Sequence, residues 1–178
     1  MKLKLFLLLW VTTFSLAVQA QCKNDKGFLL ELTAGYAHAS TYIPSETYIN
    51  ISPSLGYQFN IHWMAGFRMT FETRKYDFKI YSPYVRFNYL SRPKWGLFAE
   101  AQWNIARRSV DGGQCNYDEV GISFGGNYAL TPHIKLIGRY LFIGYSTRRE
   151  REKAYAGKHD FLLDGNIARL QAGLQLIF

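Results

Sequence analysis

The sequence predicts an all-β fold, an eight-stranded antiparallel up-and-down transmembrane β-barrel with a polar, plugged interior. Three observations support this prediction. Apolar and polar residues alternate with a period of two along eight segments, as the two faces of a β-strand require. Aromatic residues make up 17% of the chain, yet no segment of useful length has a helical period. The apolar faces of these segments carry no Asp, Glu, Lys or Arg, as contact with hydrocarbon demands.

The eight segments are each long enough to cross a bilayer as a tilted strand, which takes about 9–11 residues. In chain order they are 28–38, 48–59, 63–72, 81–89, 97–105, 120–128, 133–145 and 167–178. The seventh is more apolar than the others, but Lys135 and Arg139 still share one face of it. In the last, Leu170, Leu174 and Phe178 lie on the oily face, and Ile177 is the one misfit.

The connections between these segments alternate in length. Short ones fall near 60–62, 90–94 and 130–133, and longer ones near 39–47, 74–77, 107–119 and 146–165. Short turns on one rim and longer loops on the other are typical of antiparallel strands in up-and-down order.

Alternation alone does not say whether the oily face points into the barrel or out of it. A secreted barrel of the lipocalin kind buries its oily face, whereas an outer-membrane barrel exposes it to lipid. The polar faces are mostly Gly, Ser, Thr, Asn and Gln, whereas a soluble surface is dense in Lys and Glu. Aromatic residues also gather near the short-turn rim, as in an interfacial girdle. These residues are Tyr57, Phe59, Trp63, Phe87, Tyr89, Trp95, Tyr128 and Phe178. The oily face is therefore predicted to point outward.

Charged residues on the polar faces are predicted to form an ion-paired network inside the barrel. Charges withdrawn from water need partners, and both signs occur on these faces. The predicted network consists of Glu31, Arg68, Glu72, Arg86, Glu100, Arg139 and Arg169.

The first twenty residues have the pattern of a cleavable secretory signal. Lys2 and Lys4 precede an apolar run from about Leu5 to Leu16, and small residues at Val18 and Ala20 frame a cleavage site. Residues 1–20 are thus expected to be a signal peptide and residues 21–178 one barrel domain. Removal of the two lysines lowers the formal net charge of +8 by two. No basic stripe recurs on one element, so nucleic acid is not an expected partner.

The chain resembles the small outer-membrane β-barrels of the OmpA/OmpX-like superfamily, especially the porin-family "outer membrane β-barrel domain" proteins of Bacteroidetes. The resemblance covers everything after the signal, and "ISPSLGYQF" and the ending "LQAGLQLIF" carry it best. It implies a place in the Gram-negative outer membrane, contact with outer-membrane lipids and lipopolysaccharide, and no cofactor. It also implies that the barrel-assembly machinery reads the aromatic end, Phe178. The superfamily has many functions, so the resemblance implies a fold and a location more than a role.

Three classes of function remain open at this point. The first is a structural or interaction barrel with outer loops that contact envelope or external partners, and the second is a small porin-like conduit. The third is a lipid A-modifying enzyme, because His38, Ser40 and Glu46 resemble the catalytic set of lipid A deacylases. That set lies in the first strand here, and Thr41 stands where that family has Asn, so a polar strand end is the better interpretation. No metal-ligand pattern stands out: residues 111–119 lack the EF-hand spacing.

Two cysteines lie on opposite sides of the predicted barrel. Cys22 precedes the first strand at the periplasmic rim, and Cys115 falls in the third outer loop. The hydrocarbon core is about 30 Å thick, whereas the Cα atoms of a disulfide lie within about 7 Å of each other. We therefore expect no Cys22–Cys115 disulfide within one chain, even in an oxidising compartment. Peptide mass mapping of the folded monomer under non-reducing conditions checks this, and a crosslinked peptide pair would contradict the predicted topology.

Overall fold

The computed structural model describes residues 26–39, 46–73, 79–107, 109–110, 113–114, 116–147, 161–165 and 169–178. The predicted signal peptide and both cysteines lie outside these residues. No helix in the described ranges is long and apolar enough to cross a membrane.

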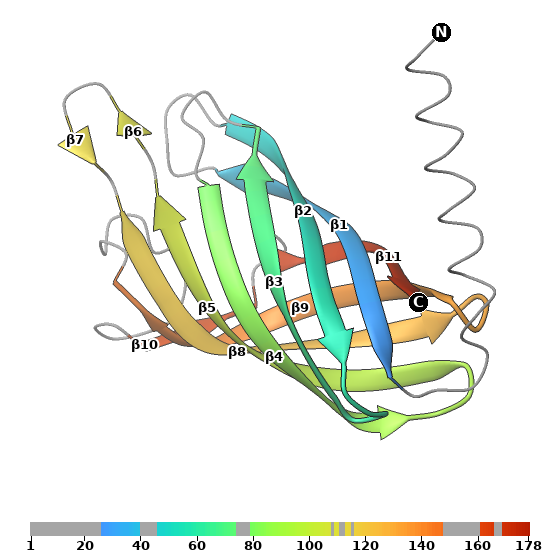
Figure 1. Cartoon of the computed structure of the whole chain (residues 1–178). Coiled ribbons are helices and arrows are strands. Elements are labelled where there is room, and N and C mark those ends of the chain that lie inside the picture. Colours follow the sequence, from blue (N-terminus) through green and yellow to red (C-terminus); the bar gives the residue numbers. More distant parts are fainter. Residues whose placement is uncertain are drawn as a thin grey trace, which may run out of the picture.

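Eight antiparallel strands close into a barrel in chain order (Figure 1). They are β1 (Gly27–Ala39), β2 (Glu46–Gln58), β3 (Trp63–Glu72), β4 (Lys79–Ser91), β5 (Trp95–Arg107), β8 (Tyr117–Ala129), β9 (Ile134–Ser146) and β11 (Gln171–Ile177). Two short strands, β6 (Ser109–Val110) and β7 (Gly113–Gln114), pair with each other between β5 and β8. A ninth member of the sheet, β10 (Phe161–Asp164), pairs with the long-loop end of β9. The predicted fold class is confirmed.

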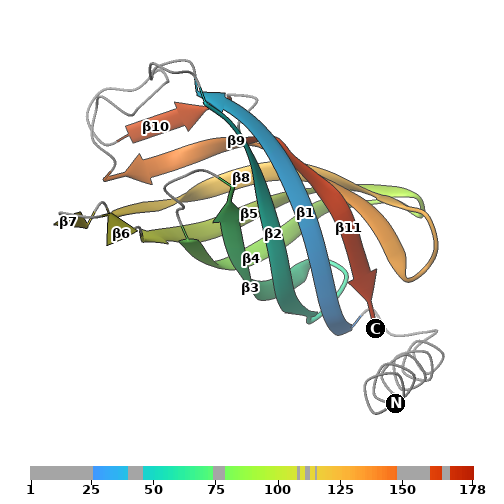
Figure 2. The same ribbon diagram turned by 90° about the horizontal axis from the view of Figure 1, so that it is seen from above.

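The first and last strands form the seam of the barrel, and they lie side by side in both views (Figures 1 and 2). Their ladder runs from Leu29 opposite Ile177 to Gly35 opposite Gln171. Beyond it, the backbone N–H of Phe178 donates to the carbonyl of Phe28 at 2.9 Å. Closure of this kind leaves no free backbone edge along the ladder. A sheet in lipid requires this, because unpaired backbone N–H and C=O groups cannot bind water in the hydrocarbon.

A bulge in β9 explains why its sequence is apolar throughout. The β8–β9 register shifts between Ser123 and Phe124, and Leu141 has a positive φ of 54°. One extra residue in a strand reverses the inside–outside alternation that follows it. Accordingly, Arg139 before the bulge and Phe142 after it are both buried, although they are three positions apart and would lie on opposite faces of a regular strand.

Most apolar side chains of the barrel lie outside and most polar ones inside, although a few apolar residues such as Leu29, Phe98 and Phe142 are buried in the interior. On β1, Leu32 is 56% exposed while the adjacent Glu31 is fully buried, and on β2, Leu55 is 67% exposed while Ser54 is 3% exposed. A barrel folded for water would bury the apolar set instead, because exposing that much hydrocarbon to water is unfavourable. The predicted in–out assignment is therefore confirmed.

Candidate functional site

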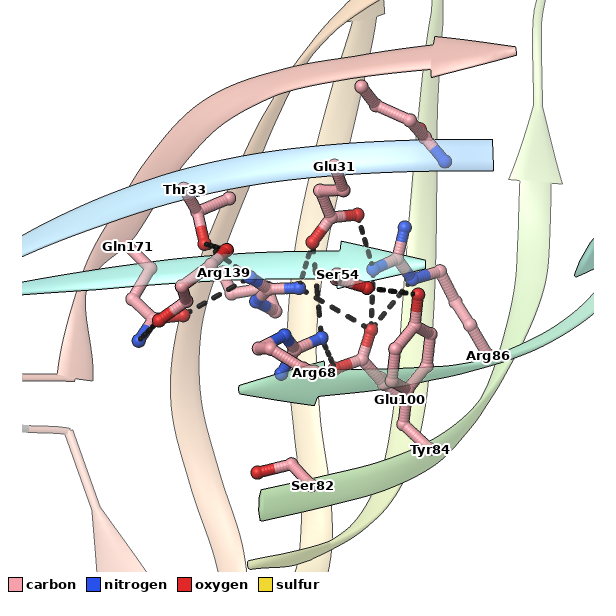
Figure 3. A network of polar contacts seen from close by, with 12 residues as sticks. Glu31, Thr33, Ser54, Arg68, Ser82, Tyr84, Arg86, Glu100, Arg139 and Gln171 are labelled. Atoms are coloured by element: carbon pink, nitrogen blue, oxygen red, sulfur yellow. Dashed lines mark hydrogen bonds and ion pairs between the residues drawn. The ribbon is translucent and has the colours of Figure 1, made fainter. Parts of the chain in front are cut away.

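Five charged side chains from five different strands meet in the middle of the barrel (Figure 3). Their exposures are 3% or less, so none of them is in contact with bulk solvent. They are Glu31 of β1, Arg68 of β3, Arg86 of β4, Glu100 of β5 and Arg139 of β9. We call this set the central network. Each member lies on the inward face because its neighbours in sequence are small or apolar residues of the outward face.

Glu100 accepts hydrogen bonds from two of the arginines. Arg86 donates from Nε to Oε2 at 2.8 Å and from Nη2 to Oε2 at 2.6 Å. Arg68 donates from Nη2 to Oε1 at 2.5 Å and uses Nη1 to reach Gln102 at 3.1 Å. Both carboxylate oxygens are thus satisfied by charged donors, which are the strongest hydrogen-bond donors available in a protein interior.

Glu31 connects the network to the seam. Arg86 donates from Nη2 to Glu31 Oε2 at 2.9 Å, and Arg139 donates from Nη1 to Glu31 Oε1. Arg139 also donates from Nη2 to Thr33 at 2.8 Å and to Gln171 at 3.1 Å. One guanidinium from β9 therefore binds side chains on β1 and β11, the two strands that close the barrel.

Aromatic rings cover the guanidinium groups that the carboxylates leave open. The guanidinium carbon of Arg86 lies 4.3 Å from the ring centre of Phe98 and 5.4 Å from that of Tyr84. Arg68 lies 4.7 Å from the same Tyr84 ring, whose hydroxyl is bonded to Ser54 at 2.8 Å. Such cation–π contacts gain strength where water is excluded. They also help to stabilise the one positive charge by which three arginines exceed two glutamates, because the ring faces attract a cation.

A second charged cluster lies nearer the long-loop end. Arg169 donates to Glu119 from Nη1 at 2.9 Å and from Nη2 at 3.0 Å, and to Asp164 from Nε at 2.6 Å. Its guanidinium carbon lies 5.0 Å from the ring centre of Phe142. The sequence predicted Arg169 as an interior residue but missed both of its partners. The sequence places Glu119 at the end of the predicted loop 107–119, whereas the structure places it in β8. The alternation of Glu119 with Gly121 and Ser123 on the polar face could have shown that this strand begins earlier.

The predicted interior set therefore falls into separate groups. Five of its members form the central network, and Arg169 belongs to the second cluster. Glu72 is partly buried at the end of β3, opposite Asn50. It lies four residues beyond Arg68, which is about 13 Å along a strand.

For the residues with the weak resemblance to a catalytic set, the structure describes only the backbone pairing of His38 and Glu46. The β1–β2 ladder pairs His38 with Thr47 and Ala39 with Glu46, and Ser40 lies outside the described residues. Among the residues that the structure describes, no group of three His, Cys, Asp or Glu side chains is placed to hold a metal ion.

Comparison with known proteins gives relatives in structure only. No protein-family model matches the chain, and no curated protein sequence matches it. Neisserial surface protein A (NspA) is 22% identical with a TM-score of 0.55, over 85% of this chain and 97% of that one. The N-terminal β-barrel domain of OprF from Pseudomonas aeruginosa is 10% identical with a TM-score of 0.57, over 87% and 98%. The de novo designed barrel TMB2.3 is 16% identical with a TM-score of 0.51, over 88% and 98%. This chain therefore has the fold of the small eight-stranded transmembrane barrels.

Proposed function

We propose that this chain is an integral outer-membrane β-barrel of a Gram-negative cell, with a structural or interaction role and a closed lumen. The central network carries the proposal. Five charged side chains from five strands cross the lumen at exposures of 3% or less, and salt bridges hold them together. The interior of an eight-stranded barrel is just wide enough for side chains to fill it. A lumen filled in this way has no continuous path for solutes.

The outward face supports the location in a membrane. Exposed aromatic residues ring the short-turn end, among them Tyr89, Trp95 and Tyr128 at 46–49% exposure. Such rings sit at the level of lipid headgroups, and short turns of outer-membrane barrels lie on the periplasmic side. We therefore place the short-turn end in the periplasm, with residues 1–20 acting as the export signal. The longer loops would then contact lipopolysaccharide and partners in the envelope or outside the cell.

Single-channel recording in planar bilayers tests the closed lumen. We expect refolded wild-type protein to give no large, stable currents. The double variant R86A/E100A keeps the net charge but removes two side chains from the lumen. Water can enter the space that they leave, so this variant is expected to show conductance. The matched control R107A/D118A removes a salt bridge of 2.8 Å whose side chains are 44% and 40% exposed outside the lumen. That control should give no single-channel current. Large stable currents from the wild type, with the folded state verified by its heat-modifiable gel band, would contradict the proposal and favour a porin-like conduit.

A further inference from the structure

Charged side chains on the outward face occur at a single place among the strands whose side chains are described. Three neighbouring strands contribute one charge each at the long-loop end of the barrel. These are Lys79 of β4, Arg107 of β5 and Asp118 of β8, which we call the rim cluster. The ladders set Lys79 opposite Arg107, and Asp118 opposite Ile105 on the same outward face. Everywhere else on these strands, the outward positions carry apolar or uncharged residues.

The height of the rim cluster matches the level of lipid headgroups. Tyr89 belongs to the aromatic ring at the short-turn end and lies ten residues from Lys79 on the same face of β4. Ten residues span about 33 Å along a strand, or about 25 Å along the barrel axis at a tilt of about 40°. The apolar band of an outer-membrane barrel is about 25 Å tall. The cluster thus lies at the far edge of the hydrocarbon, and the exposed Trp103 lies on the same face of β5, four residues before Arg107.

The chemistry of the cluster suits a phosphate group. Two cations directly opposite each other in a ladder repel, and the single carboxylate of Asp118 leaves the cluster with a net charge of +1, which a further anion would offset. Arg107 uses Nη1 alone to bind the Asp118 carboxylate at 2.8 Å and the carbonyls of Ala106 at 2.9 Å and Tyr117 at 3.4 Å. Its Nε and Nη2 make no hydrogen bond to the described residues, and an oxyanion could accept from them. The ammonium of exposed Lys79 adds a second positive charge beside them.

Asp118 is held in place from the other side. Its backbone N–H donates to the hydroxyl of Thr147 at 2.9 Å, and the backbone N–H of Thr147 donates to its carbonyl at 2.9 Å. These two bonds fix the backbone of Asp118, and its carboxylate orients the Arg107 guanidinium from that backbone position. An oriented donor loses less conformational entropy when it binds a ligand than a free one does.

The wall beneath the cluster suits acyl chains. At hydrocarbon depth the outward residues of the same three strands are uncharged. Near the middle, the ladders set Val85 opposite Ala101 and Ala101 opposite Ile122, and the next outward row holds Ala99 between Phe87 and Phe124. A ligand with a phosphate at the rim and acyl chains on this wall is a phosphorylated lipid. In the orientation given under Proposed function, the long-loop end lies in the outer leaflet of the outer membrane. The phosphorylated lipid of that leaflet is a glycolipid.

We propose that the rim cluster is a binding site for a phosphate of the lipid A portion of lipopolysaccharide, with acyl chains lying on the β4–β5–β8 wall. The inference rests on the outer-membrane orientation given under Proposed function. In it, Lys79 and Arg107 bind the phosphate and Asp118 positions Arg107.

Native mass spectrometry of the folded barrel in detergent, titrated with bis-phosphorylated or dephosphorylated lipid A, tests the site. A basic residue near an anionic membrane surface contributes about fivefold in affinity. We therefore expect the variant K79Q/R107Q to bind the phosphorylated lipid about 30-fold more weakly than wild type. The matched control R92Q/K94Q removes two exposed basic residues from the short turn between the same two strands. It should bind within about twofold of wild type, and wild type should bind the dephosphorylated lipid as weakly as K79Q/R107Q binds the phosphorylated one.

Four results would overturn the inference, and they separate it from the proposed function. Equal binding by K79Q/R107Q and wild type, or equal binding of the two lipids, refutes the site while leaving the outer-membrane barrel intact. A loss confined to R92Q/K94Q means that the barrel has the opposite orientation. Absence of the wild-type protein from the outer-membrane fraction of cells refutes the proposed function, and the site with it. The heat-modifiable gel band establishes that each variant is folded before its binding is compared.

Discussion

Replacing Glu100 by glutamine is expected to lower the free energy of unfolding by about 3–5 kcal/mol, which is the cost of breaking a buried ion pair by removing one partner. The substitution keeps the size of the side chain but removes the negative charge that Arg86 and Arg68 approach at 2.6 Å and 2.5 Å. Three buried arginines would then share the single carboxylate of Glu31. None of them can lose its proton, because the guanidinium stays charged in proteins.

Denaturant unfolding in detergent or thin bilayers, followed by tryptophan fluorescence, measures this loss. The matched control is Asp118→Asn, the same chemical change in a pair with Arg107 whose side chains are 40% and 44% exposed. An exposed pair contributes about 0–1 kcal/mol, so the control should remain close to wild type. A loss below about 1 kcal/mol for Glu100→Gln would mean that the central network does not stabilise the barrel.

The double variant E100Q/R68M separates ion pairing from packing. Methionine fills similar space without a charge, and the number of excess positive charges in the network returns to one. We expect the double variant to be less destabilised than the sum of the two single variants, because removing both partners of a buried pair costs less than stranding one. Additive losses would indicate that Arg68 and Glu100 act independently of each other.

Deleting Phe178 is expected to impair assembly in cells much more than refolding in detergent. In the structure the side chain of this residue is partly buried, and its backbone N–H donates a hydrogen bond of 2.9 Å to the carbonyl of Phe28. The lost contact is worth at most about 1.5–3 kcal/mol, and the hydrogen bond about 0.5–1.5 kcal/mol. We propose that the larger effect in cells comes from recognition of the aromatic strand end by the barrel-assembly machinery. The measurement is the yield of the heat-modifiable folded band in outer membranes and after refolding.

Two variants separate recognition from lipid contact. Phe178→Ala keeps the backbone bond and the chain length but removes the aromatic ring, so it should reproduce the assembly defect. Phe28→Ala removes an aromatic ring that is 68% exposed at the same end of the seam, and it should assemble normally. Normal yields of the deletion in cells would refute the recognition role. Equal losses in cells and after refolding would make the contribution of Phe178 purely structural.

Much of the barrel could be predicted from sequence because the signal is local. A strand alternates its faces with a period of two, so Leu32 and Glu31 are assigned to opposite sides by sequence alone. The absence of charge from one face then identifies the side that meets lipid. For the same reason the inward position of Glu31, Arg86 and Glu100 could be predicted residue by residue.

The partners of these residues depended on the tertiary structure. Which inward side chains meet is set by the stagger of each strand against the next around the closed barrel, and a period of two says nothing about stagger. Arg139 is 108 residues from Glu31 in sequence but binds it across the seam. The apolar run of β9 was a local sign of irregularity, but the position of the bulge at Leu141 could not be predicted from it, because the bulge reflects how β8 and β9 fit each other. The sequence by itself thus determined the strands, their faces and the closed barrel, whereas only the tertiary structure decided the pairing of Arg169 with Glu119 and the place of the rim cluster, since both depend on contacts between strands.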